Sequence, residues 1–219
     1  MKDKLNFNQI AFYADMTLCT GCKACMIACK DKNDLDVGVN WRRVVEYTGG
    51  EWVQEGNAWR QDIFSHYFSV SCNHCNTPIC VESCPTTALC KDENGVVSLD
   101  RDKCIGCRYC EWGCPYGAPQ YDEKSKLMTK CDFCSDYLEE GRDPACVAAC
   151  PTRALHFGEF EELKKKLNGT VSLAPLPKYE LTDPALIIKP HRNARPVGFK
   201  GGEISNPEEV RWNPKIGLW

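Results

Sequence analysis

Residues 104–115 read CIGCRYCEWGCP, and the cysteine spacing of this stretch decides the fold. Cys104, Cys107, Cys110 and Cys114 are separated by two, two and three residues, and a proline follows the last of them. This run is a ligand pattern of [4Fe–4S] clusters, in which three thiolates bind one cluster and the fourth binds the other cluster of a pair. The proline ends the short helical turn and fixes the direction in which the chain leaves the site.

The chain carries three further groups of four cysteines that resemble this run. They are Cys19, Cys22, Cys25 and Cys29 in the first group, Cys72, Cys75, Cys80 and Cys84 in the second, and Cys131, Cys134, Cys146 and Cys150 in the fourth. The first group keeps the spacing without the proline, whereas the second and fourth contain insertions. Segments 77–89 and 143–155 align without gaps and are identical at eight of thirteen positions, which indicates an internal repeat. Sixteen thiolates, four for each cluster, predict four [4Fe–4S] clusters.

The composition limits the other uses of cysteine. The chain has 219 residues and 17 cysteines, and its formal net charge is −3 from 27 basic and 30 acidic residues. A disulfide framework requires an oxidising compartment and usually an even number of cysteines. Zinc is a further alternative, but a zinc ion needs only four ligands, usually supplied as two separated pairs. The balanced charge does not favour nucleic-acid binding, and without a catalytic or nucleotide-binding motif we expect no catalytic residue and no small-molecule substrate.

No segment of the sequence is typical of a membrane anchor or an export signal. The apolar runs fall far short of the roughly 18–20 residues that a membrane span needs. Residues 1–15 lack the apolar core of a signal peptide. We therefore expect neither a signal nor a transmembrane segment in this chain.

The sequences that flank the cysteine groups indicate which groups pair. Asn94-Gly95, between the second and third groups, is a hairpin turn signal inside one two-cluster unit. Segments 65–71 and 118–121 would be the outer strands of that inner unit. By exclusion the first and fourth groups pair, with 9–14 and 153–157 as their partner strands. The alternative, first with second and third with fourth, matches these strands less well.

These pairings predict an α+β fold of two bacterial-ferredoxin-like units, one nested in the other. The outer unit comprises residues 1–33 and 123–170, the inner unit residues 65–122, and residues 34–64 are an insertion. The fourth thiolate of each group is expected to cross to the partner cluster. Cluster one then takes Cys19, Cys22, Cys25 and Cys150, and cluster two takes Cys29, Cys131, Cys134 and Cys146. Cluster three takes Cys72, Cys75, Cys80 and Cys114, and cluster four takes Cys84, Cys104, Cys107 and Cys110.

The rest of the sequence predicts short elements and an extended C-terminal arm. Residues 171–219 are rich in proline but also carry large apolar residues, among them Trp212, Ile216 and Trp219, so we expect this arm to pack on its own domain or on partners. A mobile tail is the alternative. The expected elements are a helix continuing past Cys29 to about Asn33, a strand at 41–47, a turn at Gly49-Gly50, and helices at 136–140 and 160–167.

Four residues near the cysteine groups have a structural and a functional interpretation. Arg108 and Lys130 adjoin ligands, and in the functional interpretation they raise a cluster's reduction potential. We expect the structural interpretation, in which both are solvated charges at the surface. His74 could donate a hydrogen bond to a cluster, but we expect it to pack. Cys90, the seventeenth cysteine, is expected to be a small apolar packing residue.

Several motifs beyond the ligand spacing carry a family resemblance. On these residues the chain resembles the four-cluster electron-transfer subunits of the complex iron–sulfur molybdoenzymes, and it is most similar to iron–sulfur subunits of the anaerobic dimethyl sulfoxide reductase type. The resemblance covers nearly the whole chain. The motifs are CTGCKAC at 19–25, ACKD at 28–31, WRR at 41–43, SCNHC at 71–75, CIGCRYC at 104–110, CPYGAPQY at 114–121, APLP at 174–177 and IIKP at 187–190.

The resemblance implies a non-catalytic electron-transfer subunit of anaerobic respiration. It would relay electrons between an integral membrane anchor subunit that oxidises quinol and a molybdopterin catalytic subunit. Electrons would pass through clusters one to four in either direction, with the first-group cluster facing the catalytic subunit and the third-group cluster facing the membrane. The subunit would lie peripheral to the bacterial cytoplasmic membrane, on the periplasmic face after co-export with its catalytic partner. A soluble polyferredoxin that serves several redox partners is the alternative, and a zinc-binding structural module is a further one.

Overall fold

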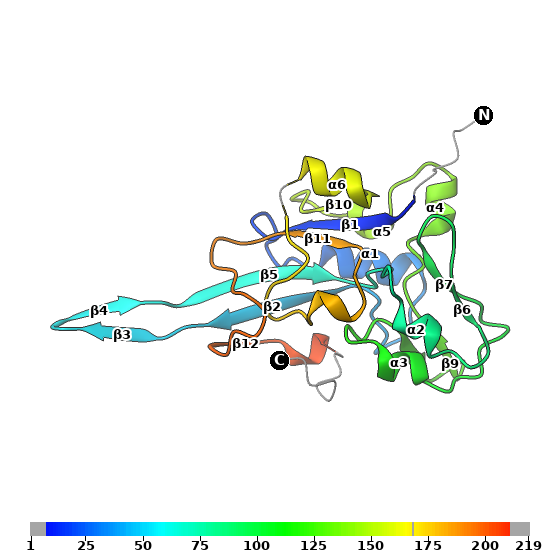
Figure 1. Cartoon of the computed structure of the whole chain (residues 1–219), viewed down its shortest axis with the longest axis horizontal. Helices are drawn as coiled ribbons and strands as arrows, with labels where there is room; N and C mark the ends of the chain where they lie inside the picture. Colours follow the sequence, from blue (N-terminus) through cyan, green and yellow to red (C-terminus); the bar gives the residue numbers. More distant parts are fainter. Residues whose placement is uncertain (1–7, 168, 211–219) are drawn as a thin grey trace.

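The computed structural model describes residues 8–167 and 169–210, which form a body of short helices and small sheets with one long projecting ribbon (Figure 1). The strands are β1 (Ile10–Asp15), β2 (Arg43–Gly49), β3 (Trp52–Glu55), β4 (Ala58–Gln61), β5 (Phe64–Val70), β6 (Leu89–Lys91), β7 (Val97–Leu99), β8 (Gln120–Asp122), β9 (Leu127–Thr129), β10 (Leu155–Glu159), β11 (Leu186–Lys189) and β12 (Gly202–Ile204). The helices are α1 (Ala24–Lys32), α2 (Ile79–Glu82), α3 (Tyr109–Gly113), α4 (Ser135–Glu139), α5 (Ala145–Ala148) and α6 (Phe160–Lys166), with short 3₁₀ turns η1 (Tyr179–Leu181) and η2 (Pro207–Glu209). This mixture of elements agrees with the α+β class.

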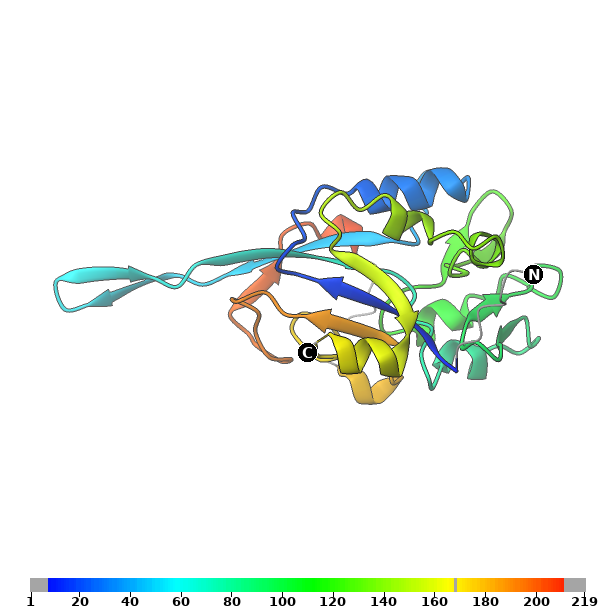
Figure 2. The ribbon, with the colours of Figure 1, turned by 90° about the horizontal axis from the view of Figure 1, so that it is seen from above.

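Strand β1 is the central strand of a sheet that joins the start of the chain to its later parts (Figure 2). All six of its residues are buried, as expected for a nearly continuous apolar run. It pairs antiparallel with β10, with Ile10 opposite Glu159 and Ala14 opposite Leu155. On its other edge it pairs parallel with β11. The predicted pairing of segments 9–14 and 153–157 is therefore confirmed, with a shift of the boundaries.

Strands β2 and β5 form a long antiparallel ribbon that continues into the β3–β4 hairpin outside the body (Figure 1). Two predictions are wrong here. The chain runs through Gly49-Gly50 and turns only at Gly56, between β3 and β4. The expected outer strands of the inner unit also do not pair, because β5 takes β2 as its partner and β8 pairs with β9. The insertion at 34–64 supplies β2, a seven-residue strand that matches β5 along its whole length.

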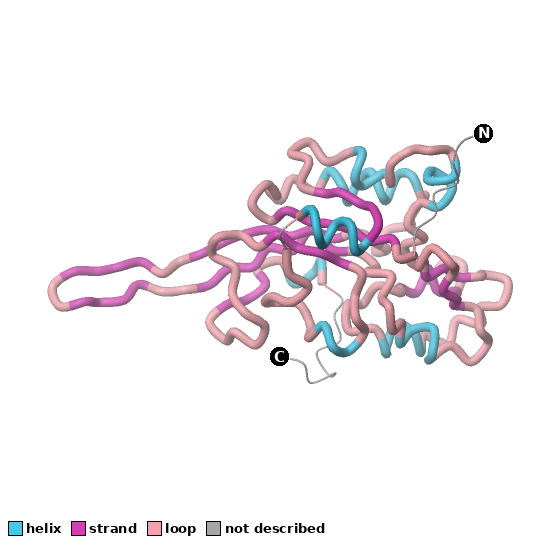
Figure 3. The backbone as a smooth tube through the Cα atoms, turned by 45° about the horizontal axis from the view of Figure 1, so that its top comes forward, coloured by secondary structure: helices cyan, strands magenta, loops and turns pink. Residues whose placement is uncertain are grey.

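The helices that carry the cysteines pack in two pairs. Helix α1 of the first group packs against α5 of the fourth, and α2 of the second group packs against α3 of the third. Figure 3 shows how short these helices are and how much of the chain around them is loop. The β6–β7 hairpin turns through Asn94-Gly95, as predicted. The packing joins the same groups that the sequence suggested as pairs.

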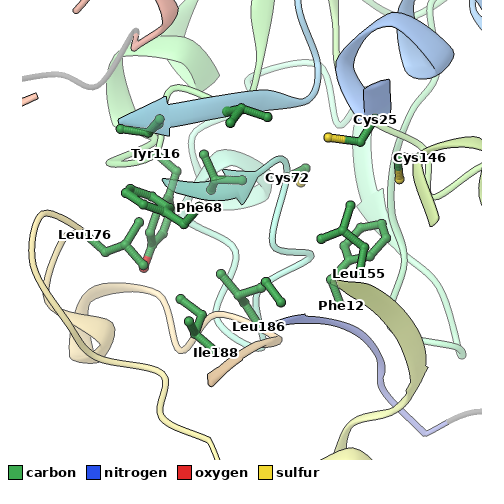
Figure 4. Packing of buried hydrophobic residues seen from close by; sticks show 14 of the residues in the cluster. Phe12, Cys25, Phe68, Cys72, Tyr116, Cys146, Leu155, Leu176, Leu186 and Ile188 are labelled. Atoms are coloured by element: carbon green, nitrogen blue, oxygen red, sulfur yellow. The ribbon is translucent and has the colours of Figure 1, made fainter. Parts of the chain in front are cut away.

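The largest buried cluster lies between the strands and the cysteine loops. Phe12 on β1 stacks on Phe133, with ring centroids 4.1 Å apart. Figure 4 shows Phe12 below Cys25 and Cys146, while Cys72 lies toward Phe68. The apolar core therefore adjoins the cysteine loops directly and keeps water from one side of them.

The C-terminal arm packs on the body. Leu173, Leu176, Ile187 and Ile188 are buried, β11 joins the sheet of β1, and β12 pairs with β2. Within residues 171–210 the expectation of an arm packed on its own domain is confirmed. Trp212, Ile216 and Trp219, which contributed to that expectation, lie outside the described residues.

Within residues 8–167 and 169–210, no helix combines the length and the apolar character that crossing a membrane requires.

Candidate iron–sulfur sites

The loops of the first and third groups share one backbone conformation. Gly21 and Gly106 have φ angles of +72° and +67°, and the residues two positions later, Lys23 and Arg108, are also left-handed. Each of these basic residues precedes a helix, α1 or α3. A Cβ atom on Gly106 would lie 2.3 Å from the carbonyl oxygen of Lys126, so no other residue fits this turn. The common conformation aims successive cysteines at one point.

The loops of the second and fourth groups are structural repeats as well as sequence repeats. Helices α2 and α5 each begin after a proline and place the last cysteine of their group just beyond the helix. The Sγ atoms of Cys84 and Cys150 lie 3.7 Å from the hydroxyls of Thr86 and Thr152, respectively. Burial alone would raise the pKa of both thiols, but these hydroxyls and nearby backbone N–H groups outweigh it and lower the pKa. Both positions are built to hold a thiolate.

The first expected ligand set lies together around α1. The electrostatic neighbours of the Cys19 thiol are Cys25, Cys150 and Cys22. Burial, followed by these thiols, raises the pKa of Cys19 to about 11. Cys150 also accepts a hydrogen bond from the backbone N–H of Ala154, at 3.2 Å from nitrogen to sulfur.

The second expected set lies between α1 and α5. Cys29 has Cys146 and Cys134 as electrostatic neighbours, and Cys131 has Cys29. Burial is the main reason that the pKa of Cys29 is raised to about 12 and that of Cys134 to about 11. The backbone N–H of Phe133 points at Cys131 Sγ, 3.4 Å away.

Three thiols of the third expected set are buried, and the fourth, Cys75, is half-buried. Cys80 has Cys72, Cys114 and Cys75 as neighbours, and burial raises the pKa of the Cys75 and Cys80 thiols strongly. The backbone N–H of Ala118 approaches Cys114 Sγ at 3.5 Å.

The fourth expected set lies at α3 and is more open. Cys110 is buried and has Cys107, Cys104 and Cys84 as electrostatic neighbours, while those three thiols are partly exposed. Burial and the neighbouring thiols raise the pKa of Cys110 to about 12.

The donor chemistry of the four sets fits iron–sulfur clusters. Each set offers four soft thiol ligands, and backbone N–H groups approach several of the sulfurs, which moderates negative charge there. In the part of the chain that the structure describes, no three Cys, His, Asp or Glu side chains stand close enough to hold one metal ion. The thiolates around a cubane core are farther apart than the ligands of a single zinc ion, which each lie about 2.3 Å from the metal. The thiol donors and the N–H groups that approach them fit an iron–sulfur cluster.

Three buried cations, Arg42, Arg43 and Lys130, lie near these thiols, and the burial of none of them was predicted from the sequence. Lys130 was expected at the surface but is buried. Burial alone would lower the pKa of Lys130, but the thiolates of Cys72, Cys131 and Cys80 outweigh burial and raise the pKa. Arg42 was named only within the WRR motif at 41–43 and without a role of its own, although a basic pair within an apolar strand was a usable signal. Arg108 is half-exposed and ion-paired with Glu111 at 2.7 Å, as expected of a surface charge.

Two further expectations meet opposite outcomes. His74 is fully buried, and its Nδ1 accepts a 3.0 Å hydrogen bond from the backbone N–H of Val97, so it packs as expected. Its Nε2 has no partner among the described residues and, with Nδ1 accepting, carries the proton. Cys90 was expected to be buried, but it is exposed, because it points outward from the edge hairpin β6–β7 and lies 3.3 Å from Ser98 Oγ.

Known proteins resemble the chain over nearly its whole length. A family model described as a 4Fe-4S dicluster domain matches residues 63–160. The sequence is 50% identical over 202 residues to the B subunit of anaerobic dimethyl sulfoxide reductase of Escherichia coli, a match that spans 92% of this chain and 98% of the relative. It is 49% identical over 203 residues to the corresponding B subunit of Haemophilus influenzae, with 92% and 99% covered. The B subunit of polysulfide reductase of Wolinella succinogenes is 40% identical over 182 residues, which cover 81% of this chain and 92% of the relative.

Proposed function

The chain is a member of the family of iron–sulfur electron-transfer subunits that includes the B subunit of anaerobic dimethyl sulfoxide reductase. On this premise we propose that it holds four [4Fe–4S] clusters and relays electrons along them. The observation that carries the proposal is the packing of α1 against α5 and of α2 against α3, which brings the first cysteine group to the fourth and the second to the third. The thiols of each expected set also affect one another's pKa. Those sets combine the fourth cysteine of one group with three cysteines of another. This is the pattern expected of two nested units with crossed ligands, the outer of residues 1–33 and 123–170 and the inner of residues 65–122.

The four sets follow one another in space. Cys25 of the first set has Cys146 of the second as a neighbour (Figure 4). Cys131 of the second set has Cys72 of the third as a neighbour. The third and fourth sets share helices α2 and α3, which each contribute or adjoin ligands of both. This order supports a single path from cluster one to cluster four.

The residues of the chain would hold and insulate this path and would not transform a substrate. Four-cysteine clusters supply one-electron transfer and leave no open iron site. The core around Phe12 and Phe133 excludes water from the inner sets. On α3, the helix that carries Cys110 of the fourth set, Tyr109 and Trp112 are exposed, with ring centroids 5.6 Å apart. The path is therefore accessible at both ends, because Cys22 of the first set is exposed and three thiols of the fourth set are half-buried.

We propose that the partners are a molybdopterin catalytic subunit and an integral membrane anchor subunit that oxidises quinol. The proposal rests on the named relatives, which are B subunits of dimethyl sulfoxide and polysulfide reductases. In such a complex the chain would be a peripheral, non-catalytic subunit. The periplasmic face stays a prediction of the family resemblance, and protease accessibility in spheroplasts would test it.

Iron and acid-labile sulfide analysis of the anaerobically purified protein tests the clusters. About 16 iron and about 16 sulfide per chain are expected from four cubanes. Stoichiometric zinc without sulfide in a natively folded sample would refute the cluster proposal and support a structural zinc module.

Co-purification tests the relay. After mild detergent extraction the protein should elute with a molybdenum-containing subunit and a membrane subunit, and quinol should reduce its clusters only in that assembly. A protein that carries clusters but elutes alone, from the soluble fraction, would support a soluble polyferredoxin instead.

A further inference from the structure

Two cationic side chains, Arg42 and Lys130, are buried in the interior beside the candidate ligands. The exposed fraction is 2% for Arg42 and 4% for Lys130. Among the ion pairs of the described residues, neither cation is joined to a carboxylate. A buried charge without an opposite charge is strongly unfavourable. The thiolates around the two cations are therefore the natural source of compensation.

The side chain of Arg42 is fixed by two serines on the strand and loop opposite. Its Nη1 donates to Ser69 Oγ at 3.1 Å, and its Nη2 donates to Ser71 Oγ at 2.9 Å. Ser69 Oγ in turn lies 3.4 Å from Cys25 Sγ. The guanidinium also lies over the ring of Phe12, 4.4 Å from its centroid. This geometry holds the positive charge one hydroxyl away from the first set.

Arg42 also adjoins the second set. Its electrostatic neighbours include Cys146, Cys131 and Cys29 as well as Cys25. The backbone N–H of Arg42 opposes the rise in the pKa of Cys29 that burial causes. One guanidinium thus serves both sets.

Lys130 occupies the corresponding place between the second and third sets. Its Nζ donates to the backbone carbonyls of Val97 and Cys131, which anchor the ammonium. Its electrostatic neighbours are Cys131 of the second set and Cys72 and Cys80 of the third, together with Asp132. The third buried cation, Arg43, adjoins Cys114 of the third set. The groups that set the pKa of Cys110 in the fourth set are thiols and a backbone N–H, with no cation among them.

We propose that Arg42 and Lys130 are the interior counter-charges of the row of clusters, Arg42 for clusters one and two and Lys130 for clusters two and three, and that each raises the reduction potentials of its two clusters. The inference rests on the proposed function. A cluster with its four thiolates carries a net charge of roughly −2, and reduction adds one electron to it. A fixed positive charge in a medium of low dielectric constant favours the more negative, reduced form.

The test is a redox titration of each cluster by electron paramagnetic resonance in the assembled protein, with signals assigned through cysteine variants of each set. Arg42→Gln should shift the reduction equilibria of clusters one and two at least tenfold toward the oxidised form, which is about 59 mV for one electron. Lys130→Gln should shift clusters two and three by as much. Cluster four should move less than threefold in both variants.

Matched variants separate charge from packing. Arg42→Lys and Lys130→Arg keep the charge and should restore potentials to within threefold of the wild-type equilibria. Arg108→Gln removes a half-exposed, ion-paired cation next to Cys107. The reduction equilibrium of cluster four in this variant should stay within threefold of the wild-type value. A shift of all four clusters alike, or no shift in the glutamine variants, would overturn the proposal.

The assembly of the variants is itself informative. If the glutamine variants lose clusters while the charge-conserving variants keep the wild-type iron and sulfide content, compensation by charge is supported. If the charge-conserving variants lose the same clusters, the side chains act by packing and the proposal fails. The iron and sulfide content of the wild-type protein is measured in parallel. A wild-type protein without iron and sulfide would refute the proposed function and not the role of the cations.

Discussion

The crossed arrangement of the ligands makes a numerical prediction about double variants. In the crossed arrangement Cys150 belongs with Cys19 in the first set, although it lies only four residues after Cys146, which belongs to the second. In a local arrangement Cys146 and Cys150 would bind the same cluster. Alanine variants at these three positions distinguish the two arrangements, because two losses in one cluster are not additive.

The expected counts follow from four clusters of four thiolates each. Each single variant should leave about three intact [4Fe–4S] clusters of about four. Cys19→Ala with Cys150→Ala should still leave about three, whereas Cys146→Ala with Cys150→Ala should leave about two. The spin count of the fully reduced protein measures intact clusters, and it is unaffected by conversion of a damaged site to a three-iron form that is silent when reduced by one electron.

A matched pair in the inner unit provides the control. Cys72→Ala with Cys114→Ala, both in the third set, should leave about three intact clusters. Cys80→Ala with Cys84→Ala, which belong to different sets, should leave about two. If the Cys146 and Cys150 double variant retained about three clusters and the Cys19 and Cys150 double variant only about two, the crossed assignment would be wrong and each group would bind its own cluster.

Three further predictions concern single positions. Burial, followed by His191 and Arg195, lowers the pKa of His66 from 6.5 to about 4, so about 3 kcal/mol of stability present above pH 6.5 should be lost as the pH falls to 4. His66→Phe should flatten that slope in urea unfolding series, and an unchanged slope would contradict the assignment. Gly106→Ala should lower the free energy of unfolding by about 3 kcal/mol or more, because the added Cβ would meet a backbone oxygen at a position of positive φ. Gly56→Ala, at φ +65° in open space, should lower it by about 1 kcal/mol in the same assay. Cys90→Ser should leave the iron content unchanged and remove one rapidly alkylated thiol detected by mass spectrometry; a loss of iron would show that Cys90 is a ligand.

The parts of the structure that the sequence predicted best are those with local or repeated causes. Ligand spacing is set by the small size of a cluster, so the cysteine groups could be recognised along the sequence before any fold was known. The repeat of segments 77–89 and 143–155 was recognised from the sequence, and the structure places the matching helices α2 and α5 in it. The pairing of β1 with β10 followed because both strands flank cysteine groups that have no other partner.

The predictions that failed depended on tertiary surroundings. Strand β5 could not be assigned to β2 from its own sequence, because the pairing of two strands depends on which of them the folded chain brings together. The burial of Lys130 was missed because a lysine is usually solvated, and only the arrangement of three thiol groups around it makes the interior favourable. The exposure of Cys90 was missed because side chains of a hairpin strand alternate between its two faces, and composition does not show which face Cys90 takes.

The central place of β1 has a consequence for the order in which the molecule can be made. This strand leaves the ribosome well before its two neighbours, β10 and β11, which are synthesised only at residues 155–189. The thiols from Cys72 to Cys114 can meet long before that, because every one of them is present once residue 114 has emerged. Cluster insertion is therefore expected to begin in the middle of the sequence and to finish at its two ends, and until then the apolar first strand has no sheet partner and needs protection from aggregation.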